Sequence, residues 1–319
     1  TACARMGDLA IPGVPMLVDM RSLKLWRPLA SRSFAVLSHS WTGGQRPTDA
    51  NQKVCVMMHG ILGSKSNWNT PSRQLLKTIG PQGWRILQLD HRAHGRSPTG
   101  SSPHNLESCA EDVLETLVHA GVPDSAELVV CGHSFGGKVA LAVLETLRQQ
   151  GRPPRKTWTF DSVPGCPAAI PAEDERRQQS VGFVLEVVKA IAGKRFAERS
   201  ELVSSLQDHG LSQPLAEWIA QSVRSTADGV ELSYDIEIVG ELYQAYLAKD
   251  MWHLFDSSSE IGVIVAGKNR HAWGTQNLQQ LQRRHEEGHV EMVTLKSAGH
   301  NVHVDDLPGL LKAIQPSFS

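Results

Sequence analysis

Near the middle of the 319-residue chain, residues 132–136 fit the pattern G-x-S-x-G, with Ser134 at its centre. The apolar run 128–131 before this motif is typical of a strand, and residues 136–149 after it have the pattern of a helix. Glycines on both sides of a serine permit a sharp, strained strand-to-helix turn that lifts the hydroxyl above a sheet. The context predicts that Ser134 is a nucleophile, and the alternative is an inert serine in a glycine-rich turn.

A serine hydroxyl is a poor nucleophile at neutral pH and needs an adjacent base to take its proton. His300 follows the last predicted strand, 290–295, and is the expected base, with His303 as the alternative. The pairs His300/His303 and His91/His94 could also be imagined as metal ligands. Neither pair has the carboxylates or cysteines that would complete a metal site, so no metal is expected.

A catalytic histidine needs an acid that fixes its tautomer and stabilises its charged form. The turn after the predicted strand 261–266 is the usual place, but residues 267–270 contain no carboxylate. Asp161 directly follows the preceding core strand, 157–160, and is the preferred candidate. Asp235 is the alternative, and either aspartate could instead be a turn or helix cap.

Acyl transfer also needs two N–H donors for the oxyanion. The amide of Phe135, the residue after the predicted nucleophile, is expected to be one of them. The other is expected from Ile61, in the glycine-rich loop 59–63 that follows the predicted strand 54–58. His59 is expected to bond this loop's backbone rather than to carry protons.

The elements that must position these residues alternate along the chain between strand and helix. Strands are predicted at 34–38, 54–58, 85–89, 128–131, 157–160, 261–266 and 290–295, and helices at 66–78, 106–119, 136–149, 275–286 and 307–314. This alternation predicts an α/β fold with a mostly parallel sheet covered by helices on both faces. The polar run 90–97 is expected to buttress the loops near the site.

One long stretch, residues 167–259, contains no convincing strand. Helices are predicted there at 181–191, 199–206, 214–222 and 239–248. Because ligands bind at the carboxyl ends of parallel strands, an all-helical insertion at this point is expected to be a lid, and a separate helical domain is the alternative. The predicted organisation is an N-terminal extension (1–33), a core (34–166 and 260–319) and a lid (167–259).

Composition excludes several other classes of protein. The net charge is −1 with both signs interspersed, so neither nucleic acid nor a membrane surface is an expected partner. No apolar run approaches the roughly 18–20 residues that span a bilayer. The five cysteines are odd in number and lack metal-ligand spacing, which favours a reducing compartment.

Together these residues resemble the α/β-hydrolase superfamily, and within it the group of abhydrolase domain-containing protein 11 and its bacterial esterase relatives. The matching stretches are His59-Gly-Ile-Leu-Gly-Ser-Lys-Ser-Asn-Trp68, Asp90-His-Arg-Ala-His-Gly-Arg-Ser97, Gly132-His-Ser-Phe-Gly-Gly-Lys138 and Ala298-Gly-His-Asn-Val-His303. Two positions depart from the family pattern: Asn301 stands where an aromatic residue often follows the histidine, and Arg96 where an acidic residue is common.

The resemblance implies an α/β-hydrolase fold with the lid between the sixth and seventh core strands. It implies a triad of Ser134, His300 and an acid. Bacterial members carry this acid at the place in the fold that Asp161 has here, and some relatives carry it in the lid, to which Asp235 belongs. The implied reaction is hydrolysis of a carboxylic ester or thioester through an acyl-enzyme, on a small, apolar acyl substrate and without a cofactor. The alternatives are a non-catalytic ligand receptor or scaffold, and an acyltransferase.

Plant and algal members of the group are targeted to the chloroplast, so the resemblance favours that location over the mitochondrion or the cytosol.

Overall fold

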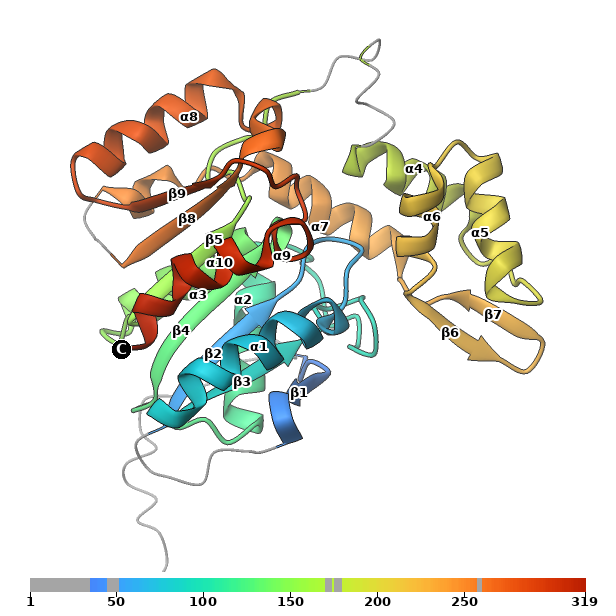
Figure 1. The fold of residues 1–319 in the computed structure, drawn as a ribbon. Helices are drawn as coiled ribbons and strands as arrows, with labels where there is room; N and C mark the ends of the chain where they lie inside the picture. Colours follow the sequence, from blue (N-terminus) through green and yellow to red (C-terminus); the bar gives the residue numbers. More distant parts are fainter. Residues whose placement is uncertain (1–34, 45–51, 170–173, 175–179, 257–259) are drawn as a thin grey trace, which may run out of the picture. The chain divides into compact units, whose positions relative to one another are not determined.

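The fold comes from a computed structural model that describes residues 35–44, 52–169, 174, 180–256 and 260–319. The predicted extension 1–33 lies outside the described residues. The strands of the main sheet are β1 (His39–Trp41), β2 (Lys53–Met58), β3 (Trp84–Leu89), β4 (Glu127–His133), β5 (Lys156–Phe160), β8 (Ile261–Ala266) and β9 (Glu291–Leu295). They lie in the order β1-β3-β2-β4-β5-β8-β9 (Figure 1). β1 is antiparallel to β3 and all other neighbours are parallel, so the predicted parallel sheet is confirmed.

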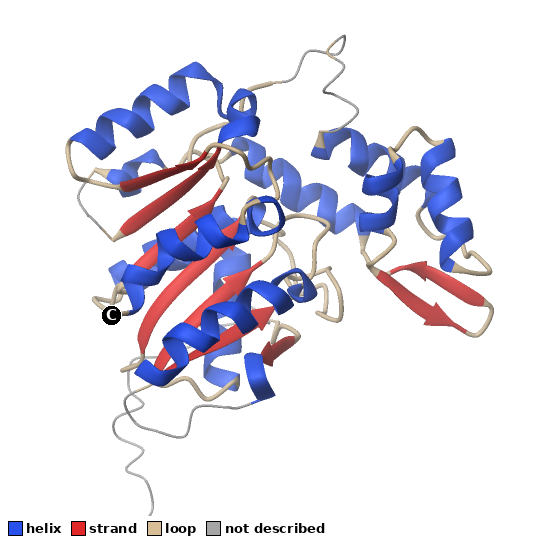
Figure 2. Ribbon diagram, in the orientation of Figure 1, coloured by secondary structure: helices blue, strands red, loops and turns tan. Residues whose placement is uncertain are grey.

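Helices cover both faces of this sheet (Figure 2). One face carries α2 (Leu106–His119), α3 (Phe135–Gln149) and α8 (Arg270–Glu286), and the other carries α1 (Asn69–Ile79) and α10 (Leu307–Ile314). Successive side chains of a strand point to opposite faces, so β2 contributes to two apolar cores. Val54 and Val56 belong to the first core, and Cys55 and Met57 to the second.

The strand order places the predicted site residues together. The chain passes from β2 to β3 on one side and returns to β4 on the other side of β2. The loops after β2 and β4, which carry Ile61 and Ser134, therefore meet at the topological switch point of the sheet. In open α/β sheets this is where a ligand crevice forms.

An insertion between β5 and β8 belongs to the same unit of the chain as the sheet. It contains α4 (Val181–Ile191), α5 (Arg199–Asp208), α6 (Gln213–Ile219), β6 (Val223–Thr226), β7 (Gly229–Leu232) and α7 (Ile236–Ala248). The prediction of an all-helical insertion is wrong, because β6 and β7 pair as an antiparallel hairpin. Each strand has only four residues, too few for a clear alternating pattern, although Asp228-Gly229 is a typical turn sequence.

Two further predictions need correction. In the described part of the chain the insertion follows the fifth strand of the sheet, not the sixth, since only five strands precede it. The predicted strand 34–38 is also wrong, and β1 begins at His39. The backbone amides of Ala35 and Leu37 instead bond Asp112 Oδ1 (2.8 Å) and Thr116 Oγ1 (2.9 Å) on α2, which removes them from the ladder.

Among the described residues, no helix combines the length and apolar character needed to cross a membrane.

Candidate active site

Ser134 stands in a strained turn between β4 and α3. Its φ of 52° and ψ of −119° are unusual for a residue with a side chain, and strain of this kind clusters at functional sites. The turn also requires glycine at its flanks. A Cβ on Gly132 would lie 1.9 Å from the carbonyl oxygen of Gly136, and a Cβ on Gly136 would lie 2.5 Å from that of His59. The G-x-S-x-G pattern is therefore imposed by close backbone approach.

The two predicted oxyanion donors lie on either side of this serine. Phe135 is the first residue of α3, so its N–H has no partner within the helix and lies at the positive end of the helix dipole. In the other loop, the carbonyl of Gly60 accepts hydrogen bonds from Gly63 N (3.0 Å) and His59 Nδ1 (2.7 Å). Since a trans peptide carries its N–H opposite its carbonyl, these bonds fix the direction of the Ile61 N–H.

His300 and Asp161 come together from the loops after β9 and β5. Nδ1 of His300 donates to Oδ2 of Asp161 over 2.7 Å. The Asp161 side chain is completely buried, whereas the His300 side chain is 35% exposed. His133, the residue before Ser134, donates from Nε2 to the backbone carbonyl of His300 (2.8 Å). This bond ties the loop after β9 to the turn at Ser134 between β4 and α3, called the elbow below.

The carboxylate of Asp161 is surrounded by donors. Oδ1 accepts from the backbone amide of Ala266 (3.1 Å) and from Trp273 Nε1 (2.9 Å). Oδ2 accepts from Asn269 Nδ2 (2.6 Å) as well as from His300. Asn269 lies in the turn after β8, which contains no carboxylate, and its side-chain amide donates to Asp161. The sequence did not predict that Asn269 and Trp273 hydrogen-bond Asp161. The available signal was the polar side chain of Asn269 in the turn after β8.

The alternative acid and base occupy different environments. Asp235 is exposed, caps α7 by accepting from Ile238 N (3.4 Å), and lines neither of the cavities at the site. His303 is buried, with its ring centroid 4.9 Å from that of Trp68. Burial, and then the neighbouring His300, lower the pKa of His303 to about 4. The helix-cap interpretation of Asp235 therefore matches its hydrogen bonding.

Three further buried histidines hold loop backbone. His59 Nε2 accepts from the amide of His91 (3.0 Å), and His94 Nε2 accepts from the amide of Leu62 (3.0 Å). Burial lowers the pKa of His59, His91 and His94, which keeps these rings neutral. Within the described ranges, no group of three or more histidine, cysteine, aspartate or glutamate side chains could hold a metal ion.

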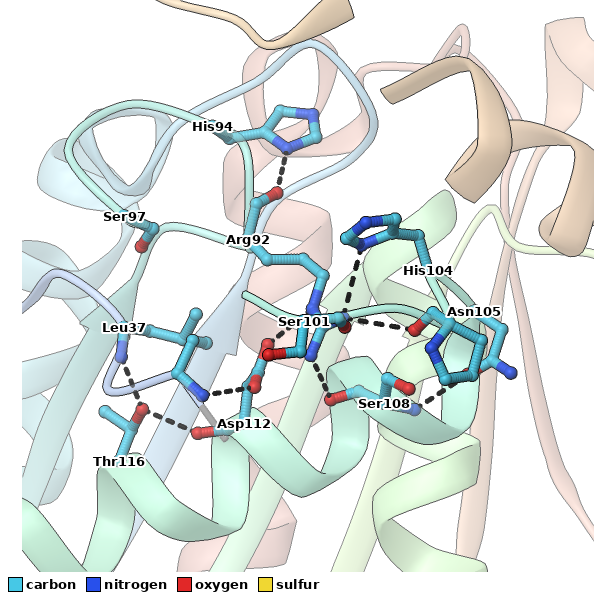
Figure 3. Close-up of polar contacts among 12 residues, drawn as sticks. Leu37, Arg92, His94, Ser97, Ser101, His104, Asn105, Ser108, Asp112 and Thr116 are labelled. Atoms are coloured by element: carbon cyan, nitrogen blue, oxygen red, sulfur yellow. Dashed lines mark hydrogen bonds and ion pairs between the residues drawn. The ribbon is translucent and has the colours of Figure 1, made fainter. Parts of the chain in front are cut away.

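The polar run 90–97 anchors the same loops. Arg92 Nε and Asp112 Oδ2 form a buried ion pair of 2.6 Å that joins this run to α2 (Figure 3). Asp90 Oδ1 accepts from the amide of Lys65 (2.7 Å), in the loop after Gly63. These contacts agree with the buttressing role expected from the sequence.

Two cavities meet at the elbow, and Ser134, His300 and Ile61 line both of them. The larger, of about 870 Å³, has apolar walls from α1, α4, α6 and α10 that include Pro71, Val184, Leu215, Trp218 and Leu307. The smaller, of about 650 Å³, is lined by apolar residues that include Phe135, Val163, Phe183, Tyr243 and Leu247. The site can therefore place apolar groups on two sides of the serine.

Comparison with known proteins shows the family of the chain. Residues 55–311 match the model of the alpha/beta hydrolase family, and the chain belongs to that family. The sn-1-specific diacylglycerol lipase ABHD11 of Xenopus tropicalis is 26% identical over 264 residues, which cover 81% of this chain and 76% of that protein. A probable alcohol acetyltransferase of Saccharomyces cerevisiae is 36% identical over 89 residues, covering 28% of this chain and 25% of that protein.

Solved structures share the fold. A marine microorganism esterase superposes with a TM-score of 0.66 at 17% identity, covering 87% of this chain and 97% of that one. With its family established, the protein is a serine hydrolase of the esterase kind.

Proposed function

We propose that the protein hydrolyses carboxylic esters through a covalent acyl-enzyme on Ser134, with His300 as base and Asp161 as the orienting acid. The observation that carries this proposal is the 2.7 Å contact between His300 Nδ1 and the buried Asp161, beside cavities that Ser134 and His300 line together. A carboxylate that accepts from Nδ1 holds the neutral ring in the tautomer whose Nε2 is free to accept a proton.

The reaction then runs in two halves. His300 takes the hydroxyl proton as Ser134 Oγ attacks the acyl carbon, and the amides of Ile61 and Phe135 stabilise the oxyanion. His300 next gives this proton to the leaving alcohol as the ester bond breaks. In the second half it takes a proton from water, whose oxygen attacks the acyl carbon, and Ser134 is released when the proton returns to its Oγ.

The cavity walls support an uncharged ester with apolar groups. Burial of apolar surface stabilises a bound ligand by roughly 25 cal/mol per Å², so apolar walls on two sides of Ser134 favour a substrate with an apolar acyl chain and an apolar alcohol. Val184, Leu215 and Trp218 come from the insertion, and their place in the wall supports its role as a lid.

Transfer of the acyl group to an alcohol is the second candidate, supported by the partial match to the yeast probable alcohol acetyltransferase. It differs from hydrolysis only in the molecule that attacks the acyl-enzyme. Product analysis with and without a short alcohol separates the two, because a transferase forms a new ester in preference to the free acid.

The direct test is Ser134→Ala with a p-nitrophenyl acyl ester. Turnover is expected to fall by several orders of magnitude, to the residual rate that oxyanion stabilisation alone supports. Ser66→Ala is the matched control, since Ser66 also lines the larger cavity and its hydroxyl hydrogen-bonds that of Ser64 (2.6 Å). Equal losses in the two variants, or no loss in Ser134→Ala, would contradict the proposal.

A further inference from the structure

The loop that carries Ile61 contains a strained residue. Leu62 has a φ of 61°, in the left-handed region that bulky side chains rarely adopt. Such a conformation is energetically unfavourable and persists only where the surroundings hold it. The conformation of the loop, and with it the direction of the Ile61 N–H, therefore depends on contacts that hold Leu62.

Both backbone groups of Leu62 are held from outside the loop. Its N–H donates to Nε2 of His94 (3.0 Å), and its carbonyl accepts from the hydroxyl of Tyr234. His94 donates from Nδ1 to the carbonyl of Arg92 (2.9 Å), which leaves Nε2 as the acceptor (Figure 3). Burial, and then the neighbouring His59, lower the pKa of His94 to about 3, so this acceptor persists at neutral pH.

Tyr234 comes from the insertion, between β7 and α7. The next residue, Asp235, donates its backbone N–H to the carbonyl of Ala93 (3.3 Å), and the Tyr234 ring centroid lies 5.8 Å from that of His94. Two consecutive residues of the insertion thus contact the loops after β2 and β3. The Tyr234 contact joins the insertion to residues 59–63, called the oxyanion loop below, and the Asp235 carboxylate takes no part in these contacts.

We propose that Tyr234 is a positioning residue through which the insertion holds the oxyanion loop in its catalytic conformation. The proposal rests on the proposed function, because it assigns Tyr234 a part in stabilising the oxyanion formed at Ser134. Without the hydroxyl, the carbonyl of Leu62 loses its partner and the left-handed residue can relax. The Ile61 amide then no longer keeps its direction, so docking of the insertion and assembly of the oxyanion hole are coupled.

Tyr234→Phe removes only the hydroxyl and tests the coupling. We expect kcat for a p-nitrophenyl ester to fall by roughly 10- to 100-fold, less than the roughly 10²–10³ lost when a donor is removed outright. KM should change little, since the contact matters most when the oxyanion forms. The affinity of an alkyl trifluoromethyl ketone, whose adduct with serine carries an oxyanion, should fall by the same factor as kcat/KM.

Ser233→Ala is the matched control, because the Ser233 hydroxyl donates to the Ser222 carbonyl (3.0 Å) inside the insertion and that bond does not reach the oxyanion loop. It should leave kcat and ketone affinity unchanged, and thermal unfolding of both variants should show that they are folded. Tyr234→Phe with parental kcat and ketone affinity would overturn the proposal while the proposed function stood. A parent without Ser134-dependent turnover would contradict both.

Discussion

The proposed acid of the site, Asp161, is a buried carboxylate that depends on its neighbours. Asp161 is surrounded by Ala266 N, Trp273 Nε1, Asn269 Nδ2 and His300 Nδ1, which bring two donors to each oxygen. A buried charge without such partners would be strongly destabilising. The donors therefore satisfy both oxygens of the Asp161 side chain and hold it facing the histidine.

Asp161→Asn should lower kcat by roughly 10³–10⁴, because the amide can hold His300 in the wrong tautomer. KM should move little, since the acid does not touch the substrate. Steady-state kinetics on an ester will measure both. Asp235→Asn serves as the control and should change kcat only slightly, because its exposed side chain caps α7. The opposite ranking of the two variants would transfer the acid role to the insertion.

Single residues could be predicted from the sequence where backbone geometry or the reaction permits only a few residue types. Close backbone approach imposes the glycines around Ser134, so the elbow could be recognised from its spacing. Asp161 could be proposed from its place after a strand. The contacts of Tyr234 and Asn269 could not, because a hydroxyl or an amide in a loop has many possible partners, and only the tertiary structure decides which one it meets.

Among the elements, long periodic segments were predicted well and short ones poorly. Helices α2 and α4 have the predicted bounds, because each has an apolar face repeated over several turns. The hairpin of β6 and β7 was missed, and β1 was displaced from 34–38 to His39–Trp41. In both places the strands have only three or four residues, and hydrogen bonds to distant parts of the chain determine where they form.

The insertion also contacts the core at the C-terminal end of α7. Lys138, on α3, is fully buried and donates to the carbonyls of Gly165 (2.9 Å), Tyr246 (2.6 Å) and Lys249 (2.5 Å). It therefore ties α3, the helix that follows the proposed nucleophile Ser134, to the C-terminal end of α7. Because Tyr234 lies just before the other end of the same helix, α7 is positioned to connect the elbow with the oxyanion loop.

Across the whole molecule, burial of neutral histidines should make stability depend on pH. Burial is the largest cause that lowers the pKa of five of them: His59, His91, His94, His133 and His303. A histidine with a lowered pKa binds fewer protons in the folded chain than in the unfolded chain. The free energy of unfolding must then decrease as pH falls below the unfolded value of 6.5, and continue to decrease to about 4 for His303 and about 3 for His94.

Urea unfolding should therefore give a smaller free energy of unfolding near pH 5 than near pH 7.5. A histidine whose pKa falls from 6.5 to about 4 contributes about 2 kcal/mol to this difference. His303→Asn removes one such group and should reduce the difference by a similar amount. Equal stability of the parent at the two pH values would contradict the assignment of these rings as buried and neutral.

The proposed function depends above all on Ser134 being the nucleophile that His300 and Asp161 activate. Its most direct test is to label the protein with a fluorophosphonate, digest it and locate the adduct by mass spectrometry. We expect one modified residue, Ser134, with labelling lost in Ser134→Ala and strongly slowed in Asp161→Asn. An adduct on another residue, or equal labelling of the parent and Ser134→Ala, would contradict it.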